Sequence, residues 1–306
     1  MTRSSGRRGR KGFSITRLEA RYAPVFLLPA FSLIGLFQLY PMVSGILISL
    51  TDWNGFAEQI PVGLSNYSAA LFDANFQTAM INTLVYVLGC VPGIVVFSLL
   101  FATLLNQKIA GKGFFRAIYY LPAITSGVSI AVIWRWIFHT DLGLLNMTLY
   151  GLGIKNMFPW LVNSRYAMTA IIITSVWKGL GVNIILMLAG LQSVPYTLNE
   201  AASIDGAGAW RRFFSITFPM ISPTIFLVIV MTMINSFQVF DTVLTMTRGG
   251  PGNATLVAVY HIYRTAFENF KMGFASAMAF ILFGAIMLVT VIQWTIRTRW
   301  VYSEME

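Results

Sequence analysis

Residues 197–223 read TLNEAASIDGAGAWRRFFSITFPMISP, a polar and helix-prone segment that lies between two long apolar runs. The segment carries four charged side chains, Glu200, Asp205, Arg211 and Arg212, in a chain where only 10% of the residues are charged. A hydrophobic fraction of 57% and a mean hydropathy of +0.70 are typical of integral membrane proteins, since soluble domains are about 25% charged. The segment is therefore expected to be a structured loop between two membrane spans.

The apolar residues form six long runs, each sufficient for a helix to cross the hydrocarbon layer of roughly 30 Å. The predicted spans are Pro24–Leu50, Phe76–Leu105, Phe114–Phe138, Tyr166–Gln192, Ser222–Met246 and Met272–Ile296. The sequence thus predicts an all-α integral membrane protein with six transmembrane helices, in which the opening segment connects the fourth helix to the fifth. The expected organisation is a basic tail over residues 1–22, a membrane domain over residues 23–299 and a short tail over residues 300–306.

Lysine and arginine are distributed unequally between the two sides that this topology defines. The side that carries both termini and the opening segment has 14 of the 21 basic residues, and the other side has five. Because positive charge marks the cytoplasmic side, both termini and this loop are expected in the cytoplasm. The net charge of +10 is distributed along the membrane edge, so it predicts contact with anionic lipid and not with nucleic acid.

Residues that would support catalysis are scarce. Cys90, the single cysteine, lies within the second span, so neither an intramolecular disulfide nor a cysteine metal site can form. His139 and His261 lie on separate external loops and lack the spacing of a metal or acid–base site. The sequence contains no G-x-x-x-x-G-K-[ST] loop, so the chain is not expected to hydrolyse ATP itself.

The opening segment divides into two helical pieces. Thr197 followed by Glu200 fits a capping box at the start of the first piece, and Gly206 permits a turn after it. In the second piece, aromatic residues recur at helical spacing opposite two arginines, which indicates an amphipathic helix that ends at Pro219 and Pro223. Such a segment fits an anchor in the membrane interface or a surface for a partner protein.

The stretch EAASIDGAGAWRRFFSITFP resembles the EAA loop of binding-protein-dependent ABC importers. That pattern is Glu-Ala-Ala, three residues, Gly, nine residues, Ile, one residue and Leu-Pro. The residues in register are Glu200, Ala201, Ala202, Gly206, Ile216 and Pro219, and Phe218 replaces the leucine. The resemblance implies a coupling helix that docks on a separate ATPase subunit, with Glu200 contacting that subunit by charge and Asp205 in the same site.

Five more stretches resemble the carbohydrate branch of this family, especially the first permease subunit of maltose-type and glycerol-3-phosphate-type systems. They read LYPMVSGILISLTDW, VGLSNY, YYLPAITSGVSIAVIWRWIF, SVWKGLGVNIILMLAGLQSVP and FDTVLTMTRGGPGNAT. The resemblance implies the type I ABC importer permease fold in a bacterial or archaeal cytoplasmic (inner) membrane. The implied partners are ABC ATPase subunits that bind ATP and Mg, a second permease subunit in a heterodimer, an extracytoplasmic solute-binding protein and a carbohydrate. This chain itself is expected to bind no cofactor and no metal.

Polar and aromatic residues in or near the spans are candidates for the cargo pathway. An ionisable residue inside a membrane is costly and therefore a functional candidate, and sugars are recognised by amides combined with aromatic faces. The candidates are Trp134, Arg135, Trp177, Lys178, Asn183, Asn235, Gln238 and Asp241. Structural roles are open for them too: Arg135 can extend to the interface, the amides can join helices, and Asp241 can pair with a basic residue.

Two other functional classes are weighed against an importer subunit. An ion-coupled secondary transporter is expected to carry acidic or histidine relays inside its spans, where Asp241 is the one acidic residue and lies near an end. A membrane-bound enzyme needs a clustered nucleophile, metal or acid–base set, which the sequence lacks. The preferred interpretation is a subunit of an ATP-driven importer for a sugar, an oligosaccharide or a polyol derivative, and the sequence leaves the cargo open.

Overall fold

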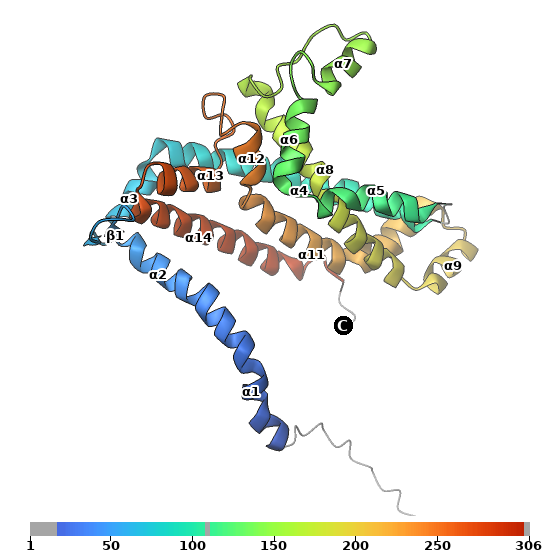
Figure 1. The fold of residues 1–306 in the computed structure, drawn as a ribbon. Coiled ribbons are helices and arrows are strands. Elements are labelled where there is room, and N and C mark those ends of the chain that lie inside the picture. Colours follow the sequence, from blue (N-terminus) through green and yellow to red (C-terminus); the bar gives the residue numbers. More distant parts are fainter. Residues whose placement is uncertain (1–16, 108–110, 303–306) are drawn as a thin grey trace, which may run out of the picture.

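The structure is a computed structural model that describes residues 17–107 and 111–302, and it is almost wholly helical (Figure 1). Within these residues, five helices are long and apolar enough to span a membrane, and a sixth span results if one bent pair is counted as one. The prediction of an all-α membrane protein is confirmed. Of the two predicted tails, residues 1–16 and 303–306 lie outside the described residues.

The first span is a continuous helix. Its three parts are α1 (Arg17–Ile34), the π-helical turn η1 (Gly35–Leu39) and α2 (Tyr40–Ser49). Pro41 lacks an N–H group, and in the π turn before it the Tyr40 N–H bonds to the Gly35 carbonyl. The end of α2 next to β1 packs against the last span, whereas α1 extends away from the other helices (Figure 1). The apolar window of this span is wholly unburied, so its surface is free for lipid or for another chain.

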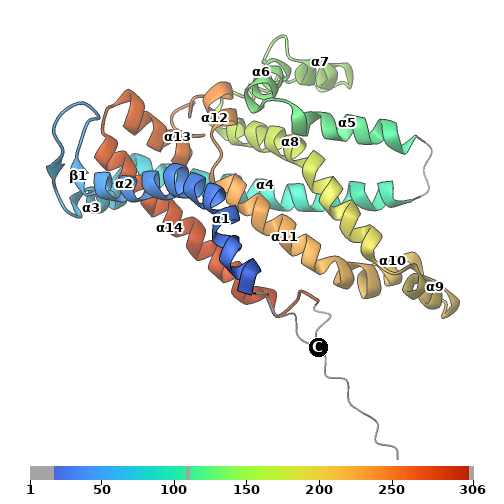
Figure 2. The same ribbon diagram turned by 60° about the horizontal axis from the view of Figure 1, so that its bottom comes forward.

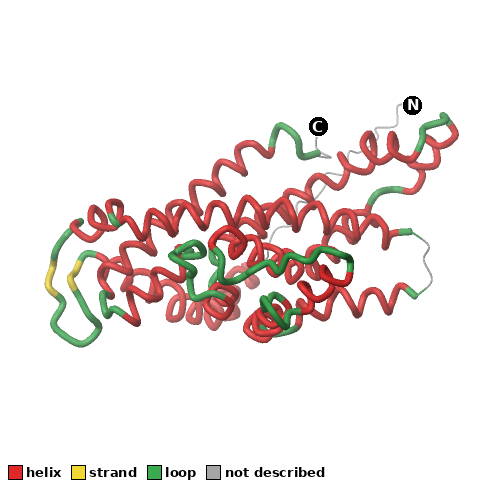
Figure 3. Tube along the Cα trace, turned by 90° about the horizontal axis from the view of Figure 1, so that it is seen from above, coloured by secondary structure: helices red, strands yellow, loops and turns green. Residues whose placement is uncertain are grey.

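A short hairpin and a helix follow the first span. They are β1 (Thr51–Asp52), antiparallel to β2 (Ile60–Pro61) with Thr51 opposite Pro61 and Asp52 opposite Ile60, and then α3 (Ser65–Phe72). Asn66 on α3 donates to the carbonyls of Ser49 and Thr51 at 3.0 and 2.9 Å, which fixes α3 to the base of the hairpin. Figure 3 shows the two strands at one end of the long helices.

Three helices form the core and two cover it. The core helices are α4 (Ala74–Asn106), α8 (Ser164–Ser193) and α11 (Phe218–Phe237), and the covering helices are α5 (Lys112–Ile124) against α8 and α14 (Met272–Arg297) against α2, α3 and α11. A Cβ atom on Gly181 of α8 would lie 2.7 Å from the Tyr119 carbonyl of α5, so this glycine permits a close approach. The predicted second, fourth and sixth spans agree with α4, α8 and α14 to within two residues.

The prediction of one helix over Phe114–Phe138 is wrong. Helix α5 ends at Ile124, α6 (Gly127–Ile137) begins three residues later, and the two are bent by 104°. Pro122 has no N–H to continue the ladder, and Thr125 adopts an extended conformation with φ −84° and ψ 142°. The apolar run therefore continues through residues 125–126, whereas the helix is interrupted there.

A fifth span is present, but its predicted bounds, Ser222–Met246, are wrong. One continuous helix runs through α10 (Ala209–Arg212), the π turn η2 (Phe213–Thr217) and α11, and α12 (Asp241–Met246) is separate and packs against α6. Pro219 and Pro223 do not end the amphipathic piece. The Phe218 N–H bonds to the Phe213 carbonyl in a π turn just before Pro219, as in the first span.

The remaining short elements lie at the ends of the long helices. They are α7 (Leu144–Gly151), α9 (Tyr196–Ile204), α13 (Ala258–Tyr263) and the π turn η3 (Arg264–Glu268). Figures 1 and 2 place α9 at one end of the helical body and β1, α3 and α13 at the other. This arrangement agrees with the predicted topology, in which the opening segment and the first external loop lie on opposite sides.

A buried hydroxyl joins α4 to the start of α13. Thr83 Oγ1 is fully buried, donates to a carbonyl of its own helix at 2.7 Å and accepts from the Ala258 N–H at 2.8 Å. The neighbouring Asn82 donates to the carbonyls of Asn253 and Leu256 at 2.8 and 3.0 Å. These bonds fix the loop between α12 and α13 against the second span.

Replacing Thr83 by valine, which has nearly the same shape, should leave the Ala258 N–H buried without an acceptor. We expect a loss of roughly 1 to 3 kcal/mol in the free energy of unfolding, measured by denaturant titration of the purified protein in detergent. The matched control is Thr174→Val, because the one bond of the buried Thr174 hydroxyl to the described residues is to the Ala170 carbonyl of its own helix. Equal costs for the two variants would contradict this role of Thr83.

Candidate coupling loop and candidate transport cavity

Helix α9 begins after Pro195, and most of its residues are exposed. None of its residues is buried, and Tyr196 and Ile204 are 78% and 82% exposed. The predicted capping box is wrong, because the helix begins before Thr197 and no side chain caps its first turn. The helix thus presents apolar and acidic side chains for which the described part of the chain supplies no core.

The turn after α9 confirms the role expected for Gly206. Its φ of +77° lies in the left-handed region, which glycine adopts without strain. The Ala207 N–H donates to the Ala202 carbonyl at 2.9 Å, and the Gly206 N–H donates to the Ser203 carbonyl at 3.1 Å. These two bonds form a Schellman motif, which satisfies the last carbonyls of α9 and reverses the chain. No atom lies within 4 Å of the place of a Cβ at Gly206, so the backbone conformation alone opposes a larger residue.

The residues of the predicted coupling set occupy two different environments. Exposed residues of α9 and the turn are Glu200, Ala201, Asp205 and Gly206, whereas Ala202, Ile216 and Pro219 are half-buried. The carboxylates of Glu200 and Asp205 form no ion pair with the described residues. Both carboxylates are therefore accessible to basic groups of another protein.

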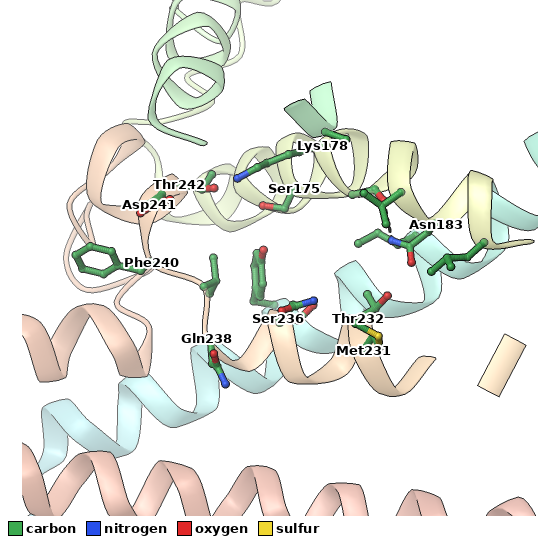
Figure 4. A pocket seen from close by; sticks show the side chains of 18 residues that line it. Ser175, Lys178, Asn183, Met231, Thr232, Ser236, Gln238, Phe240, Asp241 and Thr242 are labelled. Atoms are coloured by element: carbon green, nitrogen blue, oxygen red, sulfur yellow. Dashed lines mark hydrogen bonds between the residues drawn. The ribbon is translucent and has the colours of Figure 1, made fainter. Parts of the chain in front are cut away.

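A cavity of about 480 Å³ lies between α8, α11 and the segment that connects α11 to α12 (Figure 4). Its polar lining consists of Tyr86, Ser175, Lys178, Asn183, Thr232, Asn235, Ser236, Gln238, Asp241 and Thr242. Its apolar lining consists of Ile94, Ala123, Gly179, Val182, Leu186, Met231, Val239 and Phe240. The volume falls within the range of roughly 300 to 1,000 Å³ that small-molecule sites occupy.

Five of the eight predicted pathway residues line this cavity and three do not. Those in the lining are Lys178, Asn183, Asn235, Gln238 and Asp241. Trp134 packs with its ring centroid 5.6 Å from that of Trp177, and Trp177 lines a second, apolar cavity of about 560 Å³ between α4, α5 and α8. Arg135 is exposed in the last turn of α6. The aromatic rings at the polar cavity are instead those of Tyr86 and Phe240.

The hydroxyl residues of the cavity were not predicted, although helical spacing could have identified some of them. Ser175 precedes Lys178 by three residues on α8, and Thr232 precedes Asn235 by three residues on α11. Residues three apart share one face of a helix, so each hydroxyl accompanies a residue that the sequence did indicate. Figure 4 shows Ser175 and Lys178 on one wall and Thr232 and Ser236 on the other.

Several polar groups of the cavity have unused hydrogen-bonding capacity. Asn183 donates from Nδ2 to the Gly179 carbonyl at 2.7 Å, and this bond does not use its acceptor Oδ1. Thr232 Oγ1 is buried and has no hydrogen-bond partner among the described residues. Because buried polar groups are nearly always paired, such groups suit a site that another molecule completes. The described residues hold no cluster of three His, Cys, Asp or Glu side chains that could bind a metal ion.

Known proteins resemble this chain along most of its length. It is 36% identical over 270 residues to the multiple sugar-binding transport system permease protein MsmF of Streptococcus mutans, covering 88% of this chain and 92% of the relative. It is 33% identical over 273 residues to the sulfoquinovosyl glycerol transport system permease protein SmoG of Agrobacterium fabrum, covering 88% of each. A chain of the bacterial alginate ABC transporter, solved in complex with an alginate pentasaccharide-bound periplasmic protein, has the same fold. The TM-score is 0.77 at 23% identity, over 93% of this chain and 96% of that chain.

The match to a protein family is equally extensive. Residues 62–301 match the family described as the binding-protein-dependent transport system inner membrane component. The matches to ABC transporter permeases give no support to an ion-coupled transporter or to an enzyme. They agree with the helical arrangement, which is that of the type I importer permeases. The chain therefore belongs to the binding-protein-dependent inner membrane components, the multi-pass permease subunits of ABC transporters, in which a separate subunit hydrolyses ATP.

Proposed function

We propose that this permease subunit imports a sugar, an oligosaccharide or a polyol derivative through the cavity between α8 and α11. The observation that carries the proposal is the lining of that cavity, which combines hydroxyl and amide groups with the aromatic residues Tyr86 and Phe240. Sugars are bound by such groups, because each sugar hydroxyl both donates and accepts hydrogen bonds. The names of the relatives MsmF and SmoG support the same class of cargo.

The coupling loop is the part of the chain that we assign to the ATPase subunits. Helix α9 is exposed, apolar at Tyr196 and Ile204, and acidic at Glu200, which are the properties of a docking helix. ATP and Mg²⁺ bind at the ATPase, and this chain binds neither. The turn at Gly206 connects α9 to the continuous helix that ends at the cavity, so a movement of α9 displaces one wall of the cavity against the other.

Two more partners and the orientation belong to the same proposal. A second, homologous permease subunit completes a heterodimer, and the unburied first span offers a surface for it or for lipid. A solute-binding protein delivers the cargo at the end that carries β1, α3 and α13, and the presence of a periplasmic protein in the solved alginate transporter complex supports such a partner. Both termini and α9 then lie on the cytoplasmic side of a bacterial or archaeal inner membrane.

The orientation predicts which introduced cysteines react with a membrane-impermeant thiol reagent in intact cells. A cysteine at Ser4 or Ser303 should stay unlabelled until the membrane is opened, and one at Asn253 should react from outside, because basic residues gather on the cytoplasmic side. The native Cys90 is fully buried and should not react. Labelling of either terminus in intact cells would overturn this topology.

The source of energy gives a second prediction. Proteoliposomes that contain this chain, its partner permease, the ATPase and the binding protein should accumulate cargo only when ATP is supplied. The reason is that the chain has no phosphate-binding loop and that Asp241 is the one acidic residue expected in its predicted spans. Uptake by this chain alone, driven by a proton or sodium gradient, would refute the proposal.

The coupling loop gives a third prediction. Glu200→Ala removes a charge-assisted contact of roughly 1.5 to 3 kcal/mol, and Gly206→Val opposes the left-handed turn. Both variants should insert normally but lose ATPase binding, measured by co-purification, and ATP-dependent uptake, measured in proteoliposomes.

Two matched controls separate coupling from general damage. Asp141→Ala removes an exposed carboxylate between α6 and α7, and Gly153→Val disturbs another glycine with positive φ and no atom near its missing Cβ. Both should keep normal uptake. If the loop variants keep ATPase binding and uptake as well, α9 is an anchor in the membrane interface and not a coupling helix.

A further inference from the structure

Two opposite charges meet at the break of the third span. The side chains of Lys178 on α8 and Asp241 on α12 both reach Gly127, the first residue of α6. Lys178 Nζ lies 2.6 Å and Asp241 Oδ2 2.9 Å from the place that a Cβ on Gly127 would occupy. Figure 4 shows the Lys178 side chain extended toward Asp241 and Thr242. Both charged groups line the cavity, so this point is part of its wall.

The two charges are close without forming a direct ion pair. In the described part of the chain, the oppositely charged contacts within 4.0 Å are Arg264 with Glu268 and, when the histidine is protonated, His261 with Asp73. Lys178 and Asp241 are also the two charged side chains among the described residues that line the cavity. The cavity therefore has one positive and one negative group, with no net charge, and each group keeps capacity for another partner.

This pair of opposite charges suits one kind of ligand group. A hydroxyl group can donate to a carboxylate and accept from an ammonium at the same time. A carboxylate, sulfonate or phosphate group can only accept, so it would gain a bond to Lys178 but face repulsion from Asp241. A cationic group would be attracted by Asp241 but repelled by Lys178.

We infer that Lys178 and Asp241 together bind one hydroxyl group of an uncharged cargo, and that this pair excludes anionic sugars. Gly127 is the residue that makes the arrangement possible, because any side chain there would occupy the space where the two groups converge. The inference rests on the proposed function, since it assumes that cargo passes through this cavity. It specifies that the cargo is uncharged, and it assigns the determination of specificity to Lys178, Asp241 and Gly127.

The test uses the complete transporter with its binding protein in proteoliposomes supplied with ATP. Uptake is measured for a neutral panel of maltotriose, raffinose and xylobiose and for an anionic panel of digalacturonate, glucuronate and glycerol 3-phosphate. We expect uptake from the neutral panel alone. Lys178→Met and Asp241→Asn should each lower kcat/KM for the neutral cargo by about 10- to 100-fold, because each removes a charge-assisted hydrogen bond.

Matched controls make the same chemical changes away from the cavity. Lys155→Met and Asp141→Asn alter exposed residues and should leave uptake unchanged. Gly127→Ala should lower uptake, whereas Gly113→Ala should not, since no atom lies within 4 Å of the place of a Cβ there. Co-purification with the ATPase and melting temperature in detergent should be equal for all these variants, which separates cargo binding from folding.

The outcomes distinguish this inference from the proposed function. Uptake of an anionic sugar by the unchanged transporter, or charge variants that match their controls, would overturn the inference and leave sugar import intact. A complex that hydrolyses ATP but carries neither panel, with a binding protein that binds neither, would overturn both.

Discussion

A helix that stops among apolar surroundings must find new partners for the backbone groups that it frees, and this constraint shapes the whole molecule. The chain meets it at two places, between α5 and α6 and between α11 and α12. The helices that follow the two breaks, α6 and α12, pack against each other. The polar cavity lies beside this contact, where the regular packing of α4, α8 and α11 is interrupted.

The breaks also explain why charged residues are tolerated there. Asp241 is the first residue of α12, and the unpaired N–H groups at a helix start favour a carboxylate. Gly127 is the first residue of α6, so the absence of a side chain coincides with the point where the helix begins. Two unrelated interruptions thus bring Gly127 and the Asp241 carboxylate to Lys178 of the continuous helix α8, although Gly127 and Asp241 are far apart in the sequence.

The sequence predicted the straight helices well and the broken ones poorly. The second, fourth and sixth spans were found because one apolar run corresponds to one helix. In the third and fifth spans the apolar run continues through residues such as Thr125 and Val239, and composition does not distinguish an extended segment from a helical one. Pro122 was the local signal of the first break, but membrane helices such as α4 continue through a proline, so the residue alone did not decide it.

Some of the functional residues could likewise be predicted from the sequence, and others could not. The loop turn at Gly206 was predictable because a glycine between two helical pieces has a specific conformational reason. The capping box failed because α9 begins at Tyr196 with Pro195 in the N-cap position, so Thr197 already lies inside the first turn and cannot cap it. The charged residues were identified by their cost in a membrane, and the amides by the hydrogen bonds that a sugar needs. Trp134 and Trp177 were predicted as aromatic faces for a sugar, but the two rings pack against each other outside the polar cavity. Serine and threonine carry little such cost and gave no signal by themselves.

The helix from Ala209 to Phe237 has a mechanical consequence. It contains 29 residues without a break, and at about 1.5 Å per residue it is about 40 Å long. One end adjoins the exposed loop and the other carries Thr232 and Asn235 in the cavity wall. Such a helix acts as a lever: a tilt of a few degrees at the loop becomes a shift of ångströms at the cavity. The two ends cannot respond independently, so no chain of side-chain rearrangements is needed to connect them.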